Sequence, residues 1–180
     1  MRPEQNGVDY IMNITSEMLV YEGSITESAA ATYTEDDIIL PVNQFSDQGV
    51  IIYGFEVGSA EPQDLPAAGD TVEAIVVGLY TSSQTDTVGI ENQETIARTL
   101  FKKLGDGTDW LFFFEEREGI PHKGTVSDHN YKTLENKIHV GIKSTNASAG
   151  ATAGYRIYLK TVEYTDSEAK ALLYAKTYED

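Results

Sequence analysis

Along most of the chain, hydrophobic and polar residues alternate with the two-residue period of β-strands. The alternation is clearest at Ile138, Val140 and Ile142, which place three apolar side chains on one face. Glycine, proline, aspartate and asparagine separate the apolar segments, as is typical of turns between strands. The pattern predicts strands at residues 17–21, 37–42, 50–57, 71–81, 109–115, 131–134, 137–144 and 155–164, with a further strand after 23–24.

Segment 155–164 carries large side chains on both of its faces. Ile157 and Leu159 point to one side, whereas Tyr158, Val162 and Tyr164 point to the other. Such a strand is covered on both sides, or is covered on one side and contacts a partner.

The densest apolar segment is residues 110–114, which read Trp-Leu-Phe-Phe-Phe. We predict a central strand buried on both faces. The alternative is a strand with one face in a subunit contact, because aromatic residues are enriched at interfaces.

Two segments interrupt the β pattern with helical spacing. Residues 92–104 place Ile96, Leu100, Phe101 and Leu104 on one helical face, so an inserted helix is expected there. Residues 167–178 are expected to form a C-terminal helix. It would begin with a capping box, Thr-Asp-Ser-Glu at 165–168. The small, uncharged residues 146–154 predict a mobile loop between two strands.

The charge of the chain is large and uneven. The 180 residues carry a net charge of −16 and contain no cysteine. Residues 1–97 hold 17 acids and one base, whereas residues 98–180 hold 12 of each. Nucleic-acid binding needs clusters of lysine and arginine, so direct contact with nucleic acid is not expected. The longest apolar runs, 74–80 and 110–114, are far shorter than the about 20 residues of a membrane-spanning helix.

The residues give little sign of catalysis. The three histidines, His122, His129 and His139, lack the i, i+4 spacing of a helical metal site, although the three together with an acid such as Glu115 remain an alternative. Ser167 and Lys170 have the Ser-x-x-Lys spacing of penicillin-recognising enzymes, but the start of a helix explains Ser167 better. Nucleotide-binding and acyl-transfer motifs are missing from the sequence. We therefore predict no catalytic residues, no cofactor and no enzyme activity.

Asp106 and Asp109 are the candidate metal ligands that remain. Their carboxylates, with backbone oxygens of the Gly-Asp-Gly-Thr segment at 105–108, have the oxygen chemistry that calcium prefers. The spacing is not that of a helix–loop–helix calcium loop, so a plain turn is the stronger interpretation. A structural divalent cation stays an open alternative.

The order of the predicted elements resembles a known family. A short N-terminal arm (1–16) precedes one domain (17–180) of about eight strands, with a helix inserted near the middle. The final segment Tyr-Arg-Ile-Tyr-Leu-Lys-Thr-Val-Glu-Tyr (155–164) runs into the helix cap at 165–168. This organisation resembles the single jelly-roll major capsid proteins of icosahedral viruses with an internal membrane. It is most similar to the smaller capsid subunit of the haloarchaeal, sphaerolipovirus type.

The resemblance implies a fold, a role and a location. The fold would be an all-β single jelly-roll sandwich, and the chain would be a structural capsid subunit of an archaeal-type virion. Its partners would be copies of itself and other capsid subunits, and it would lie over an internal membrane without inserting. A carbohydrate-binding β-sandwich, lectin-like or an adhesion domain, is the alternative function. A cupin-type enzyme is a third, weakened by the lack of a histidine cluster.

The uneven charge leads to a last expectation. In a jelly roll, strands from the acidic first half lie beside strands from the neutral second half. Bases of the late strands, namely Lys132, Lys137, Lys143, Arg156 and Lys160, are therefore expected to face early acids such as Glu17, Glu56 and Glu73. These pairs would leave a surplus of surface acids, so assembly is expected to need high salt, bound cations or a more basic partner.

Overall fold

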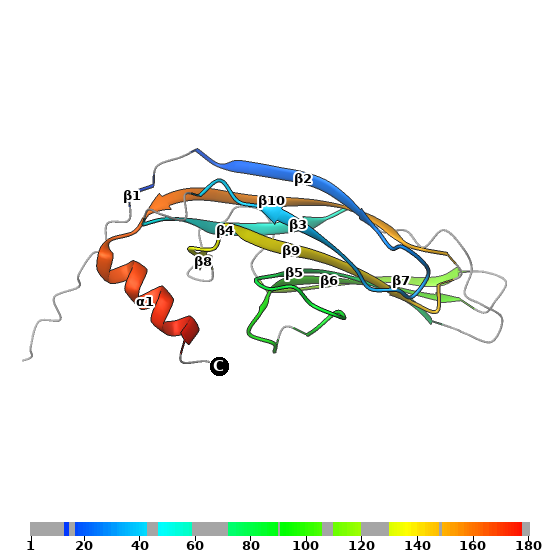
Figure 1. Ribbon diagram of the computed structural model, residues 1–180. Coiled ribbons are helices and arrows are strands. Elements are labelled where there is room, and N and C mark those ends of the chain that lie inside the picture. The colour runs from blue at the N-terminus through cyan, green and yellow to red at the C-terminus, as the bar shows by residue number, and fades with distance from the viewer. Residues whose placement is uncertain are drawn as a thin grey trace, which may run out of the picture.

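The computed structural model of the chain describes residues 13–14, 17–42, 47–58, 72–89, 91–105, 110–119, 130–147 and 149–177. Within these residues it is a β-protein with one helix near the C-terminal end (Figure 1). Its elements are β1 (Asn13–Ile14), β2 (Leu19–Thr26), β3 (Thr34–Ile39), β4 (Gln48–Val57), β5 (Val72–Tyr80), β6 (Thr95–Gly105), β7 (Trp110–Gly119), β8 (Tyr131–Thr133), β9 (Lys137–Thr145), β10 (Thr152–Glu163) and α1 (Asp166–Thr177).

The strands form two antiparallel sheets of five strands each. In the first sheet the order is β2-β10-β4-β8, and β1 pairs with the end of β10 on the edge that β2 also uses. In the second sheet the order is β3-β9-β5-β6-β7. Figure 1 shows β2 and β10 on one side of the molecule and β5 and β6 on the other. The expected all-β sandwich is therefore confirmed at the level of two packed antiparallel sheets.

Alternate residues of both sheets build the core between them. Ile138, Val140 and Ile142 of β9 are fully buried in one cluster with Ile157 and Leu159 of β10. Removing each such side chain from water stabilises the fold by about 1.5–3 kcal/mol. The apolar face predicted for residues 138–142 is thus confirmed, and it faces the other sheet.

A second, smaller cluster lies on the opposite face of the first sheet, where α1 covers it. Val162 and the adjoining Tyr164 are buried there with Ile51 and Tyr53 of β4 and Ala169 of α1. Because neighbouring strand residues point to opposite faces, β4 and β10 contribute to both clusters. The end of segment 155–164 is therefore covered on both faces, and the chain's own helix provides the second cover at Val162 and Tyr164. Nearer the start of the segment, Arg156 is exposed.

The predicted capping box starts α1. The Thr165 N–H donates to Glu168 Oε2 at 2.9 Å, and the Glu168 N–H donates to Thr165 Oγ1 at 3.4 Å. These bonds satisfy two backbone donors that the first helical turn leaves without partners. The Thr165 N–H, followed by the Thr165 hydroxyl that donates to Glu168 Oε2 at 2.8 Å, lowers the pKa of the Glu168 carboxyl. Ser167 lies in the first turn of α1, in agreement with its interpretation as part of a helix start.

Replacing Thr165 by alanine is expected to lower the free energy of unfolding by about 1 kcal/mol, the usual effect of losing an N-cap hydroxyl. Ser167→Ala is the matched control, because the Ser167 hydroxyl bonds only the Thr165 side chain among the contacts described. Urea unfolding of both variants measures the difference. Equal effects would show that the cap does not stabilise α1.

The helix predicted at residues 92–104 is wrong, because this segment is strand β6. β6 pairs with β5 on one edge and with β7 on the other. Its register shifts beside Tyr80, so that Tyr80 lies opposite Thr95 and Leu79 opposite Ala97. Ile96 is the extra residue of this β-bulge, and both Ile96 and Ala97 are buried in the core. Two consecutive core residues break the two-residue period, which is why the segment resembled a helix.

The prediction of a central strand at residues 110–114 is also wrong. They begin β7, which pairs only with β6 among the described residues and lies at the edge of the second sheet. Side-chain burial at 110–115 lies outside the described residues.

Several boundaries differ from the predicted ones. The segments predicted at 17–21 and after 23–24 form one strand, β2, and β3 spans Thr34–Ile39 instead of 37–42. β10 begins at Thr152, inside the loop predicted at 146–154. Backbone pairing to β9 holds the acidic start of β3 in the sheet, which composition alone does not indicate.

Candidate functional site

A histidine and two acids meet on the outer face of the second sheet. Glu35 and Asp37 are two residues apart on β3 and therefore share one face of the strand. Asp37 lies directly opposite His139 of β9. On the other face of the same strands, Ile38 and Ile138 point into the core. The register of β3 and β9 thus brings two carboxylates to one imidazole, and we call Glu35, Asp37 and His139 the His139 cluster.

The donor atoms of the His139 cluster are close together. His139 Nδ1 lies 2.9 Å from Asp37 Oδ1 and 3.2 Å from Glu35 Oε1. The side chains of His139 and Glu35 are only 5 % and 13 % exposed, whereas that of Asp37 is 55 % exposed. Although both oxygens are near, Nδ1 makes no hydrogen bond, because neither oxygen is aligned with an N–H on this nitrogen.

The second oxygen of each carboxylate is held by other groups. Glu35 Oε2 accepts hydrogen bonds from the Tyr33 hydroxyl and the Gln84 N–H, both at 2.8 Å. Asp37 Oδ2 accepts one from Lys137 Nζ at 3.0 Å, which lowers the pKa of the Asp37 carboxyl. Burial, followed by the bond to Glu35, raises the pKa of the Tyr33 phenol, so Tyr33 is a neutral donor. These contacts leave one oxygen of each carboxylate directed at His139.

Two glycines make room for tyrosine rings beside the cluster. Gly78 of β5 lies opposite Gly141 of β9. A Cβ at Gly141 would collide with the Tyr33 ring and hydroxyl, and one at Gly78 would collide with Tyr80. Tyr80 is fully buried, which raises the pKa of its phenol to about 12. The absence of a side chain at Gly141 therefore makes room for Tyr33, whose hydroxyl bonds Glu35.

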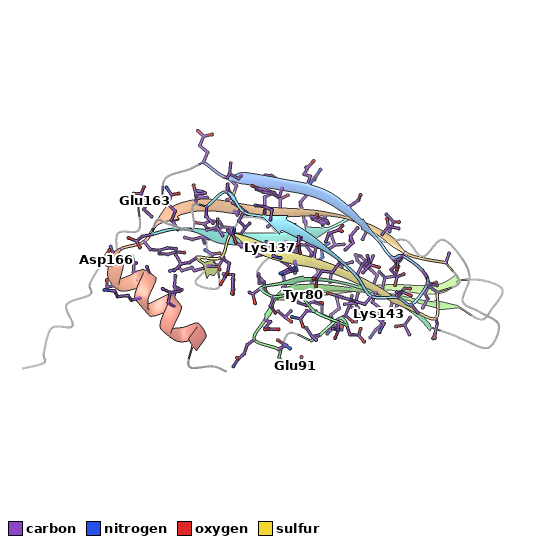
Figure 2. All side chains as sticks on the ribbon, in the orientation of Figure 1. Tyr80, Glu91, Lys137, Lys143, Glu163 and Asp166 are labelled. Atoms are coloured by element: carbon purple, nitrogen blue, oxygen red, sulfur yellow. The ribbon has the colours of Figure 1, made fainter. Side chains whose placement is uncertain are left out.

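The segment that follows β5 covers this part of the sheet. Its Gln84 N–H bonds Glu35, and its Asp86 carboxylate accepts two hydrogen bonds from Lys143 Nζ of β9, at 2.8 and 2.7 Å. Figure 2 shows Lys143 and Tyr80 on the second sheet and Glu91 in the segment beyond it. The His139 cluster is therefore bounded by β3, β9 and this segment.

A hollow of about 420 Å³ with charged residues in its lining lies elsewhere, at one end of the first sheet and beside Arg117 of β7. Across β2 and β10, Arg156 Nε bonds Glu22 Oε1 at 2.7 Å. Across β10 and β4, the Tyr158 hydroxyl donates to Glu56 Oε2 at 2.5 Å. We call this site the end hollow, and it is lined by Glu22, Gly23, Glu56, Val57, Gly58, Arg117, Gly154, Tyr155 and Arg156.

The structure describes only part of the predicted candidates. Asp106, Asp109, His122 and His129 lie outside the described residues, and so does the side chain of Glu115. His139 is described, but its neighbours are Glu35 and Asp37, which lie far from it in the sequence and were not among the predicted site residues. The signal that could have found them is an acid-x-acid alternation on one strand, together with knowledge of the strand pairing.

The expected pairing of late bases with early acids is present on both sheets. Lys137 pairs with Asp37, Lys143 with Asp86, and Arg156 with Glu22. The register of β10 and β4 also sets Arg156 opposite Glu56, one of the acids named from the sequence. Asp37, Asp86 and Glu22 were not named, because cross-strand register and a loop selected them. The paired side chains are 30–62 % exposed, so solvent screens each pair and it contributes little to the free energy of unfolding.

The sequence matches no protein-family model and no curated protein. Among the described residues, α1 is the only helix, and it is neither long nor apolar enough to cross a membrane.

Proposed function

We propose that this chain is a jelly-roll structural subunit, which assembles with copies of itself and with other capsid subunits into an icosahedral virus shell. The observation that carries the proposal is the nested order of strand pairing. β2 pairs with β10, β3 with β9, β4 with β8, and β5 with β6. The first strand of the domain thus pairs with the last. Each following strand, taken in order along the chain, pairs with a strand that comes before the partner of the previous one.

Nested pairing is what results when one long antiparallel ribbon is rolled up. Rolling the ribbon places its successive strands alternately in two sheets, here β2 and β4 in the first and β3 and β5 in the second. The resulting orders, β2-β10-β4-β8 and β3-β9-β5-β6, support the proposal of an eight-stranded jelly roll, with β7 as one further strand at an edge. This architecture recurs in viral capsid and lectin domains.

Exposed apolar side chains support a subunit contact at one side of the sandwich. Val20 of β2 is 47 % exposed, and Ile39 of β3 is 62 % exposed, with Met18 just before β2. β2 and β3 lie at the corresponding edges of the two sheets and contact each other. Edge strands with apolar side chains favour association with another chain.

The uneven charge fits a shell in which other components meet the genome. A chain with net charge −16 repels nucleic acid, so we propose that it makes no direct contact with the genome. We also propose that it lies over an internal membrane of the virion without inserting into it. In this role it has no catalytic activity. Its place is the capsid of the virion.

Electron microscopy and mass spectrometry of native particles test the proposal. We expect closed shells that contain this chain in many copies. Recovery of the chain only as free protein, with no particle, would contradict the proposal.

The surplus of acids predicts how such a shell responds to salt. Light scattering is expected to show loss of particles when salt is diluted from about 1 M, where charges are screened beyond about 3 Å, to about 0.01 M. The same dilution with a chelator separates screening from cation binding. Shells that stay intact in dilute buffer with chelator, without a basic partner at their contacts, would show that the acids play no part in assembly.

A carbohydrate-binding sandwich is the second candidate, and the end hollow favours it. The half-buried Tyr155 lies there among carboxylates and guanidinium groups, a combination that suits stacking on a sugar ring and bonding its hydroxyls. Titration of the free chain with oligosaccharides, with Tyr155→Ala as the test variant, would detect saturable binding. Binding by a chain that forms no shell would favour this function over the first.

A further inference from the structure

We infer that Glu35, Asp37 and His139 form a binding site for one divalent transition-metal ion. The inference rests on an imidazole nitrogen that is buried, close to two carboxylate oxygens and without a hydrogen bond. A buried polar atom without a partner is costly, and native proteins rarely leave one in place. A cation between the three atoms would satisfy it.

The spacing of the three atoms fits metal coordination. With metal–ligand bonds of about 2.0–2.2 Å, neighbouring donor atoms of a tetrahedral or octahedral site lie about 2.8–3.6 Å apart. Both distances from Nδ1, 2.9 and 3.2 Å, fall in this range. All three donor atoms lie within 4.8 Å of one another, so a single ion can reach them with small side-chain movements.

The carboxylates are held in the way that metal ligands usually are. Tyr33 and the Gln84 backbone fix Glu35, and Lys137 fixes Asp37, each by bonding the oxygen that faces away from His139. Such outer contacts orient ligands and limit the entropy that is lost when the ion binds. The exposed Asp37 side chain leaves a route for the ion and for water as further ligands.

The donor set and the charge select the class of ion. One imidazole nitrogen with two carboxylate oxygens suits Zn²⁺ or Mn²⁺, whereas Ca²⁺ and Mg²⁺ prefer oxygen alone. Glu35, Asp37 and Lys137 together carry a net charge of −1, which a divalent ion reverses to +1. The alternative occupant is a proton on Nδ1, but its N–H would have to align with an oxygen, and neither oxygen is so placed.

A bound ion would tie together parts of the chain that are distant in sequence. Asp37 and His139 belong to an edge strand and its neighbour, and Glu35 connects to Gln84 in the segment after β5. The ion would therefore hold edge strand β3 against the sheet. Because it needs only a single folded chain, this site does not depend on the proposed capsid role.

Calorimetry on the full-length chain tests the inference. After removal of metals with a chelator, titration with ZnCl₂ or MnCl₂ is expected to show one saturable site per chain. The melting temperature is expected to rise by about 5–10 °C when free Zn²⁺ exceeds its dissociation constant about 100-fold. Absence of saturable binding, or tighter binding of Ca²⁺ than of Zn²⁺, would overturn the proposal.

Two variants of equal charge separate a specific site from a generally acidic surface. Asp37→Asn is expected to weaken Zn²⁺ binding by about tenfold or more. Because the Asp37 side chain is exposed, the variant is expected to fold. Asp36→Asn is the matched control, since Asp36 lies opposite Val140, points away from the cluster and is exposed. Its affinity is expected to stay within about twofold of the original. Equal losses in both variants would show non-specific binding.

Nuclear magnetic resonance identifies the ligand atom without any substitution. The chain has three histidines, so long-range ¹H–¹⁵N spectra distinguish their rings. Zn²⁺ is expected to shift Nδ1 of His139 and to leave His122 and His129 unchanged. A shift at the other two histidines alone would place the ion elsewhere and contradict the assignment.

Discussion

Replacing Phe101 by alanine is expected to lower the free energy of unfolding by about 3–5 kcal/mol. Phe101 lies on β6, is 2 % exposed and belongs to the core between the sheets. The substitution removes a large apolar side chain and leaves a cavity, because the strands on both edges of β6 hold the backbone in place. Urea unfolding followed by circular dichroism measures the loss.

Leu100→Ala is the matched control for Phe101→Ala. In a strand, neighbouring residues point to opposite faces, and Leu100 is only partly buried on the outer face. We expect it to cost about 1 kcal/mol. In the helix first predicted for this segment, the side chains of Leu100 and Phe101 would share one face. Similar losses in the two variants would therefore contradict the strand assignment of β6.

Local patterns were sufficient to predict most elements of the fold. The alternation at residues 137–144 gave β9 almost to the residue, because one face of that strand is uniformly apolar. The capping box at Thr165 and Glu168 located the start of α1, since its hydrogen bonds join residues only three positions apart. Signals of this kind depend on near neighbours in sequence, so a single sequence contains them.

The errors arose where distant residues decide the structure. Ile96 and Ala97 are both in the core because of a β-bulge, which is set by the pairing of β6 with β5. The segment at 110–114 was predicted as central from its apolar content, yet its place in the sheet depends on the order of strands. Periodicity gives the faces of a strand but not its neighbours.

The candidate site could not be predicted for the same reason. Asp37 and His139 are far apart in sequence, and only the antiparallel register of β3 and β9 sets them opposite each other. A register displaced by one residue would put His139 opposite Asp36 or Ile38 and leave no cluster. The sequence shows many acids and three separate histidines, but the chemistry results from the juxtaposition of two acids with one histidine.

The other large effect is expected at Glu27, a carboxylate that is only 4 % exposed. It accepts hydrogen bonds from the Ser144 N–H at 2.5 Å, the Ser144 hydroxyl at 2.6 Å and the Ala151 N–H at 2.8 Å. These bonds join the end of β2 to the end of β9 and to the residue before β10. They connect both sheets at one end of the sandwich.

Glu27→Ala is expected to lower the free energy of unfolding by about 2–4 kcal/mol. The variant leaves three donors without a partner, and each unsatisfied buried donor costs about 1–3 kcal/mol. Water that enters the site offsets part of this cost. Glu22→Ala is the matched control, because Glu22 lies on β2, which ends just before Glu27, and has an exposed side chain paired to Arg156. Its loss is expected to stay below about 1 kcal/mol.

A double-mutant cycle between Glu27→Ala and Ser144→Ala assigns the effect to these bonds. If the carboxylate acts through Ser144, the two losses are not additive, and the coupling is expected to be about 1 kcal/mol or more. Hydrogen exchange should also be faster at the amides of Ser144 and Ala151 in Glu27→Ala, since both lose their acceptor. Additive losses with unchanged exchange at both amides would show that Glu27 stabilises the protein by packing alone.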